Sequence, residues 1–174
     1  DKNVVAVQGA VTLPTGVEED INKALDIPTG DGQTDIGLGI IHDFKPSDKM
    51  TLTSSLEYTY QTGDEVAARI PEVNDSKVTG DIDDAVQRKL GNIVKGQFNI
   101  TYNVFKGITL GSGYTYQHKK EDKFSGSKFS AERYEWMGGL GQAPEQSMQS
   151  LLLQADFSTI PLFKEKKFPV PLKL

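Results

Sequence analysis

Four stretches of this chain alternate apolar side chains with small polar ones. The clearest covers residues 50–60, where Met50, Leu52, Leu56 and Tyr58 stand at alternate positions and Ser54 is the only interruption. Successive side chains of a strand point to opposite sides, so this spacing predicts a strand with one apolar and one polar face. A tilted strand of about ten residues can also cross a bilayer. The pattern predicts an all-β protein, an antiparallel up-and-down transmembrane β-barrel.

The same alternation predicts seven strands in a single domain over residues 1–174. They are residues 4–13, 34–44, 50–60, 96–105, 108–118, 150–159 and 168–174. Short connections at 45–49, 106–107 and 161–167 alternate with long ones at 14–33, 61–95 and 119–149. Short turns on one side and long loops on the other are typical of outer-membrane barrels. Within the long loops we expect short helices over residues 18–25 and where Ile82, Val86, Leu90 and Ile93 recur at helical spacing.

Alternation alone does not say which face meets lipid. A soluble barrel of the lipocalin type would turn its apolar face inward around a ligand. The apolar faces of the second to fifth strands carry no Asp, Glu, Lys or Arg, and His42 is their only ionisable residue apart from tyrosines. The opposite faces hold small polar residues rather than the many Lys and Glu of a soluble surface. We therefore expect lipid outside and an aqueous lumen lined by Asp35, Asp43, Thr53, Glu57, Gln97, Asn99, Asn103, Gln117 and Asp156.

Aromatic residues gather at the ends of several predicted strands. Ring bodies favour the apolar zone of a bilayer while their polar tips reach the headgroups. We expect two interfacial bands, made of Phe44, Tyr58, Tyr60, Phe105, Tyr114, Tyr116 and Phe168. Ordinary β-propensity of Tyr and Phe is the alternative explanation. Lys119 and Lys120 follow the fifth strand and are candidates to bind lipid or lipopolysaccharide phosphates, or are simply solvated loop charges.

The composition limits the other classes of function. The formal net charge is −5 and no basic stripe is present, which argues against nucleic acid as a partner. The sequence contains no run of 18 apolar residues, so it predicts no transmembrane helix. Cysteine is absent, the only histidines are His42 and His118, and the acidic runs lack calcium-loop spacing. We expect no enzyme activity, no cofactor and no metal site, since neither a nucleophile elbow nor a serine triad is visible.

Several short motifs resemble one known family. They are residues 11–16 (VTLPTG), 30–39 (GDGQTDIGLG), 57–64 (EYTYQTGD) and 168–172 (FPVPL). They resemble the meta-pathway phenol-degradation family of outer-membrane barrels, which is related to the long-chain fatty-acid transporters. The resemblance implies a barrel of about a dozen strands and a role in uptake of hydrophobic or aromatic compounds.

Seven strands do not close an even-numbered antiparallel barrel. We therefore expect the chain to be a fragment, or to be completed by missing strands or a partner chain. The expected function is passive passage or binding of small solutes, including hydrophobic or aromatic ones, in the outer membrane of a bacterial cell. Two alternatives stay open. One is a structural barrel that anchors or scaffolds an envelope complex through its long loops, and the other is a soluble ligand-binding β-barrel.

Overall fold

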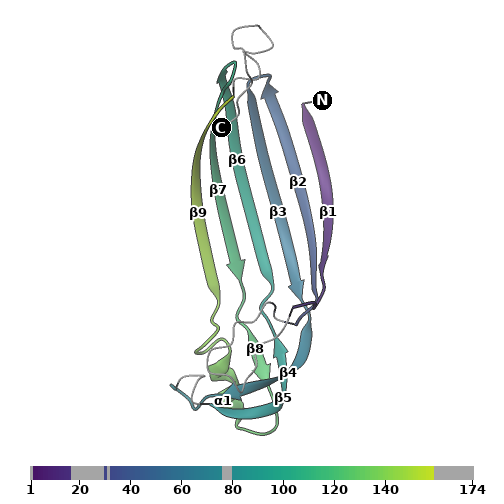
Figure 1. Ribbon diagram of the computed structural model, residues 1–174, viewed down its shortest axis with the longest axis vertical. Helices are drawn as coiled ribbons and strands as arrows, with labels where there is room; N and C mark the ends of the chain where they lie inside the picture. The colour runs from purple at the N-terminus through teal and green to yellow at the C-terminus, as the bar shows by residue number, and fades with distance from the viewer. Residues whose placement is uncertain (1, 17–29, 31, 76–79, 159–174) are drawn as a thin grey trace.

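The computed structural model describes residues 2–16, 30, 32–75 and 80–158 (Figure 1). Its larger part is one six-stranded antiparallel sheet with the order β1-β2-β3-β6-β7-β9. The strands are β1 (Asn3–Thr12), β2 (Asp35–Ser47), β3 (Met50–Gln61), β6 (Ile93–Phe105), β7 (Ile108–Lys119) and β9 (Gln146–Phe157). Each strand pairs with its neighbour over almost its whole length, so the side chains stay in a fixed register across the sheet.

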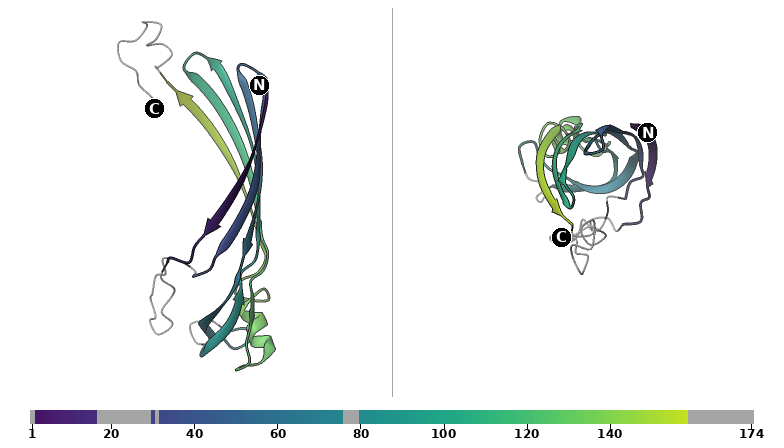
Figure 2. Two further views of the ribbon diagram at one scale, coloured as in Figure 1. Left: turned by 90° about the vertical axis from the view of Figure 1, so that its right-hand side faces the viewer. Right: turned by 90° about the horizontal axis from the view of Figure 1, so that it is seen from above.

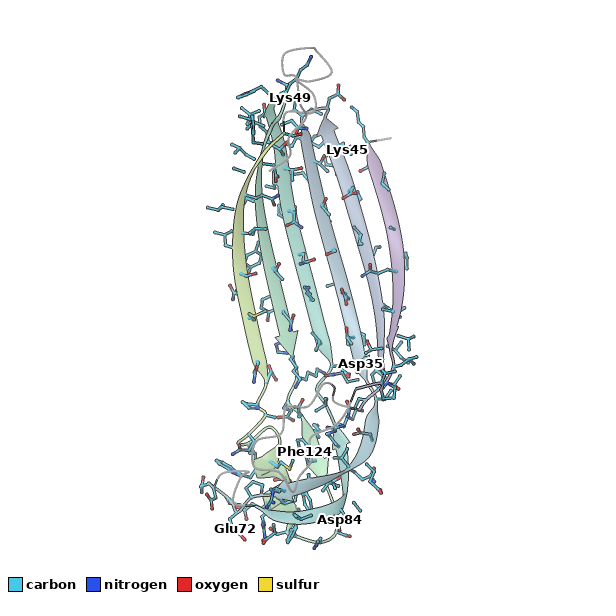
Figure 3. The ribbon with its side chains drawn as sticks, in the orientation of Figure 1. Asp35, Lys45, Lys49, Glu72, Asp84 and Phe124 are labelled. Carbon is cyan, nitrogen blue, oxygen red and sulfur yellow. The ribbon has the colours of Figure 1, made fainter. Side chains whose placement is uncertain are left out.

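The second part lies at one end of the sheet (Figure 1). It contains a three-stranded antiparallel sheet of β4 (Gly63–Ile70), β5 (Asp81–Lys89) and β8 (Lys123–Ser125), and the helix α1 (Ala131–Met137). We call this part the cap and define it as the described residues of 63–91 and 120–145. Figure 3 shows Asp35 where the six-stranded sheet meets the cap, and Glu72 and Asp84 at the cap's far end.

The hydrophobic core of the described residues lies in the cap and not in the six-stranded sheet. Its buried members are Ala68, Ile70, Val86, Tyr134 and Met137, with Val66, Phe124 and Phe129 packed against them. Arg133 is also buried there, where its guanidinium donates to the carbonyl oxygens of Pro71 and Ile70 at 3.0 and 2.5 Å. The six-stranded sheet is a single layer, so it holds its shape by backbone pairing and not by a core.

The predicted short turns at 45–49 and 106–107 and the predicted long connections at 61–95 and 119–149 are confirmed, whereas 161–167 and most of 14–33 lie outside the described residues. Lys45 and Lys49 mark the short β2–β3 turn at the end away from the cap (Figure 3). The β6–β7 connection is also short. Its Gly107 has a φ of 90°, a backbone conformation that residues with a side chain rarely adopt. The long insertions that follow β3 and β7 both enter the cap.

The six strands of the sheet were predicted within a few residues of their ends. β9 begins four residues earlier than expected, at Gln146. The predicted seventh strand at 168–174 and the predicted helix at 18–25 lie outside the described residues. Within the described residues the sheet does not close into a barrel, because β1 and β9 are its two edges and do not pair with each other. The prediction of an antiparallel all-β fold is therefore confirmed, while closure is not seen in this part of the chain.

The helix predicted from Ile82, Val86, Leu90 and Ile93 is wrong. Residues 81–89 form strand β5, and Ile93 begins β6. The β4–β5 pairing shifts register between Val66 and Ala68, which pair with Val86 and Asp83 respectively. Such a bulge inserts an extra residue, so the buried residues Asp83 and Val86 stand three apart in the sequence. The four residues of the predicted helix lie on two strands and the link between them, so their spacing does not reflect a helix.

Replacement of a core side chain should destabilise the cap selectively. Ile70 is fully buried, so Ile70→Ala should lower the free energy of unfolding of the cap by about 2–5 kcal/mol. Trp136, the only tryptophan of the sequence, lies in α1 and reports on the cap through its fluorescence during urea titration. Ile40→Ala, at an exposed position of β2, is the matched control and should leave the same transition unmoved. Equal shifts in the two variants would contradict a core confined to the cap.

Candidate functional site

The two faces of the six-stranded sheet differ in exposure as well as in chemistry. The apolar side chains point into open space: Leu38, Leu56 and Leu110 are 62%, 55% and 48% exposed. Directly opposite residues of an antiparallel pair share a face, and the register aligns Ile40 with Leu56. Residues at the alternating positions, whose side chains belong to the opposite face, are less exposed, and Gly37, Gly39 and Gly113 are buried. The apolar face is therefore the open face of this sheet.

Curvature explains this difference. Seen from above, the sheet forms an arc (right-hand view of Figure 2). Side chains diverge on the convex side of an arc and crowd together on the concave side. The more exposed, apolar residues consequently occupy the convex side, and the less exposed polar residues occupy the concave side.

All nine predicted lumen candidates lie on one face, the concave one. Asp43 aligns with Thr53, Thr53 with Asn99, and Asn103 with Thr109, which in turn aligns with Asp156. Gln117 aligns with Lys95, and Lys95 with Glu57, so an acidic and a basic residue stand opposite each other. The remaining two candidates, Asp35 and Gln97, fall at positions of the same parity in β2 and β6.

Hydrogen bonds between neighbouring strands connect these polar side chains. The Thr53 hydroxyl donates to the Asp43 carboxylate at 2.6 Å, and the Thr109 hydroxyl donates to the Asn103 amide oxygen at 2.6 Å. The Gln97 amide donates to the Thr115 hydroxyl at 3.3 Å. Glycines occupy further positions of this face in β2 and β7, so the concave side carries few bulky groups. The arrangement forms a polar, hydroxyl- and amide-rich trough.

The aromatic residues of the convex face lie near both ends of the strands and also in the middle of the sheet, where Phe98 and Tyr114 align with Ser54. Tyr58, Tyr60, Tyr114 and Tyr116 lie in the halves of β3 and β7 nearest the cap, and all four are exposed. Phe44 and Phe105 lie beside the short turns at the other end, and Phe168 is outside the described residues. Three of the tyrosine hydroxyls have polar partners: Tyr58 accepts from Asn92 at 2.7 Å, Tyr114 donates to Gln149 at 3.1 Å, and Tyr116 lies 3.4 Å from the Ser147 hydroxyl.

The two lysines predicted to meet lipid have different surroundings. Lys119 forms an ion pair with the buried Asp122 at 2.6 Å, and Asp122 also accepts from the backbone N–H of Gly91 at 2.7 Å. Lys119 falls at a position that aligns with Ile93, on the concave face. Lys120 is exposed at the end of β7. Lys119 thus helps to join the sheet to the cap, and Lys120 is the more exposed of the two lysines.

A second polar cluster joins the cap to the sheet. Asp64 at the start of β4 pairs with Arg88 of β5 and accepts from the Gln33 side chain at 2.8 Å. Burial by itself would raise the pKa of Asp64, but the hydrogen bonds from Arg88 and Gln33 and the charge of Arg88 outweigh it, so the pKa lies below its usual 3.8. In the cap core, burial and the neighbouring Asp83 carboxylate, to which Tyr134 donates, raise the pKa of Tyr134 above 10.

Sequence reasoning missed the cap and the residues that organise it. Arg133, Tyr134 and Met137 lie on the buried side of α1, a helix that begins after Ser130 and ends before Gly138. A serine before the run and a glycine after it are ordinary helix boundary signals. Their spacing would have located the helix. Among the described residues no group of three His, Cys, Asp or Glu side chains forms a metal site, and no helix there is long and apolar enough to span a membrane.

Acid should weaken the cap through Asp64. Its folded pKa lies below 3.8, so its ion pair stabilises the fold above that value and loses its contribution as pH falls through the lower folded pKa. We expect the urea concentration at the midpoint of the Trp136 fluorescence transition to decrease when the pH is lowered below about 4. Asp64→Asn should lower the midpoint at neutral pH and flatten its fall in acid. An unchanged acid profile in this variant would contradict the role given to the pair.

One family model matches most of the chain. Residues 1–144 match the family described as "Putative MetA-pathway of phenol degradation". A search of curated proteins gives no match. The match covers most of the chain and includes five of the six strands of the larger sheet and nearly all of the cap. The chain therefore belongs to this phenol-degradation family.

Proposed function

We propose that the six-stranded sheet is part of the wall of an outer-membrane β-barrel through which small hydrophobic or aromatic solutes pass passively. The observation that carries the proposal is the exposure of the apolar, convex face beside a polar, concave trough. A contiguous apolar surface on this scale is costly in water. In a bilayer it would be solvated by acyl chains, and the trough would line an aqueous lumen.

The strand dimensions support a membrane-spanning role. The strands of the sheet have 10 to 13 residues, and a tilted strand needs about 9–11 to cross the hydrocarbon core. Exposed aromatic residues stand near both ends of the strands, at the levels where headgroups would lie. On this view Lys120 and the tyrosines nearest the cap would meet lipid or lipopolysaccharide, and the cap would stand outside the bilayer.

The edge strands have to be paired in this setting. An unpaired backbone group costs several kcal/mol in hydrocarbon, so an open edge is not tolerated there. β1 runs toward the cap and β9 runs away from it (Figure 1). The proposal therefore requires additional strands beside β1 and β9, supplied by this polypeptide or by a partner chain.

One alternative function has an observation in its favour. The cap has its own hydrophobic core, which favours a role as a docking platform for an envelope protein. In that case the barrel would act as an anchor and need not conduct. The soluble ligand-binding barrel has less support, because Leu38, Leu56 and Leu110 point into open space and not into a shared interior.

Conductance of the full chain in planar lipid bilayers tests the channel proposal. We expect discrete conductance steps above those of protein-free bilayers, and flux of small uncharged solutes in proteoliposome swelling. Inserted protein that gives neither conductance nor flux would exclude a channel and favour the anchor. The same preparation, probed for a co-purifying protein in fixed ratio, would then identify the docking partner.

Arginine substitutions on the two faces of β3 test the orientation. Leu56→Arg should place a cation in hydrocarbon and lower the stability of the inserted protein by about 2–4 kcal/mol. Thr53→Arg should place it in the aqueous trough beside Asp43, with little loss of insertion but altered conductance and ion selectivity. Urea titration in lipid vesicles measures the first effect and bilayer recording the second. Equal loss of stability in the two variants would contradict the assignment of faces.

A further inference from the structure

One row of the concave trough differs from the next row in the length and the charge of its side chains. The pairing of the six strands aligns one residue from each strand, and five of these residues have long side chains: Gln8, Gly39, Glu57, Lys95, Gln117 and Met148. We call this set the charged row. The next row, on the side away from the cap, carries no charge and consists of Ala6, Ile41, Ser55, Gln97, Thr115 and Ser150.

The polar side chains in the middle of the charged row lack partners among the described residues. Glu57, Lys95 and Gln117 stand on the neighbouring strands β3, β6 and β7 and are half-buried. They form no ion pair and no side-chain hydrogen bond with another described residue. In the next row, by contrast, the Gln97 amide is hydrogen-bonded to hydroxyls of both adjacent strands, at 3.5 and 3.3 Å. The charged row therefore keeps an acid, a cation and an amide available to whatever occupies the trough.

A glycine lets the charged row continue onto the edge strand β1. A Cβ on Gly39 would lie 2.9 Å from both the Cγ and the Nε2 atom of Gln8. The Gln8 side chain thus crosses the β2 backbone at a point where no side chain stands. Its amide extends over β2 toward Glu57 on the next strand. A side chain at position 39 would displace this amide and break the row.

Lys95 is the one basic residue of the described trough, away from the turns, that has no acidic partner. The concave positions of the strands there carry two bases, Lys95 and Lys119, and Lys119 is paired with Asp122 at 2.6 Å. The acids at these positions are more numerous: Asp35, Asp43, Glu57 and Asp156. Walls of low dielectric focus the field of such charges into the space that they enclose. An acidic lining attracts cations, so Lys95 opposes the charge of its surroundings.

We infer that Glu57 and Lys95 set the charge selectivity of the pore, with Lys95 as the residue that admits anions past an otherwise acidic lining. The inference rests on the proposed function, because it concerns solutes that move through the trough. Charged side chains that line a channel select ions by the sign of their charge. Here an acid and a base stand directly opposite each other on adjacent strands, so a passing ion meets both. Removal of either charge leaves the other uncompensated.

Reversal potentials in a KCl gradient test this inference with the full chain in planar bilayers. Lys95→Gln removes the cation and should raise the permeability ratio of K⁺ to Cl⁻ about fivefold, the effect of one charge close to an ion in water. Glu57→Gln leaves Lys95 uncompensated and should lower the same ratio by about the same factor. The double variant Glu57→Lys with Lys95→Glu keeps both charges in the row and should restore a ratio close to that of the unaltered protein.

Two exposed residues of the β2–β3 turn supply matched controls. Asp48→Asn and Lys49→Gln make the same changes in net charge, but outside the trough, where water and salt screen them. Both should leave the permeability ratio nearly unchanged. Equal shifts in the turn variants and the row variants, or no shift in either row variant, would overturn the inference. Currents with unaltered selectivity would overturn only the inference, whereas the absence of any current would overturn the channel and the inference together.

A thiol at position 57 tests the same point within one inserted molecule. The sequence contains no cysteine, so Glu57→Cys introduces the only thiol. A methanethiosulfonate reagent that carries a sulfonate replaces the lost negative charge and should return the permeability ratio toward its original value. The corresponding trimethylammonium reagent should lower the ratio further. Because each current is compared before and after modification, a folding defect cannot imitate these opposite shifts. Currents that neither reagent changes would place this position outside the lumen and overturn the inference.

Discussion

Antiparallel register is the constraint on which this structure depends. Side chains alternate between two faces, so a slip of one residue in any strand would move the convex leucines and tyrosines of that strand to the concave side. Both the polar trough and the apolar face exist only because five successive pairings keep the same parity. The hydrogen bond between Thr53 and Asp43 and that between Gln97 and Thr115 cross strand boundaries, and both would be lost by such a slip.

The cap is stabilised by a different interaction from the large sheet. It buries Ile70, Val86 and Tyr134 between a small sheet and a helix, so its stability comes from removal of apolar surface from water. Arg133 joins these layers through the carbonyl oxygens of residues 70 and 71 and an ion pair with Asp81 at 3.0 Å. A buried guanidinium needs all of these partners, because a charge without them would destabilise the core. Within the described residues, the chain thus combines a cap that has its own hydrophobic core with a sheet whose apolar face is exposed.

This division explains what the sequence could predict. In the large sheet, one face is mainly apolar, so the period of two was visible for all six strands, and their ends were found within a few residues. The cap strands gave no such signal, because both faces of β4 and β5 carry charged residues and a bulge breaks the alternation at Asp83. The pairing of Asp64 with Arg88 depends on a contact between residues 24 positions apart in the sequence. Local patterns do not contain that information.

The two edge strands place conditions on any strand that completes the sheet. Beside β1, a neighbour in register has to present apolar residues next to Val5, Val7 and Val11, and small polar ones next to Gln8. Beside β9 the pattern required of a neighbouring strand is less regular. The three successive residues Leu151, Leu152 and Leu153 are all exposed, so leucines stand on both faces of β9. Leu152 lies on the concave side, where it aligns with Gly113, a residue that has no side chain. Leu152 therefore interrupts the polar lining of the trough with an apolar side chain.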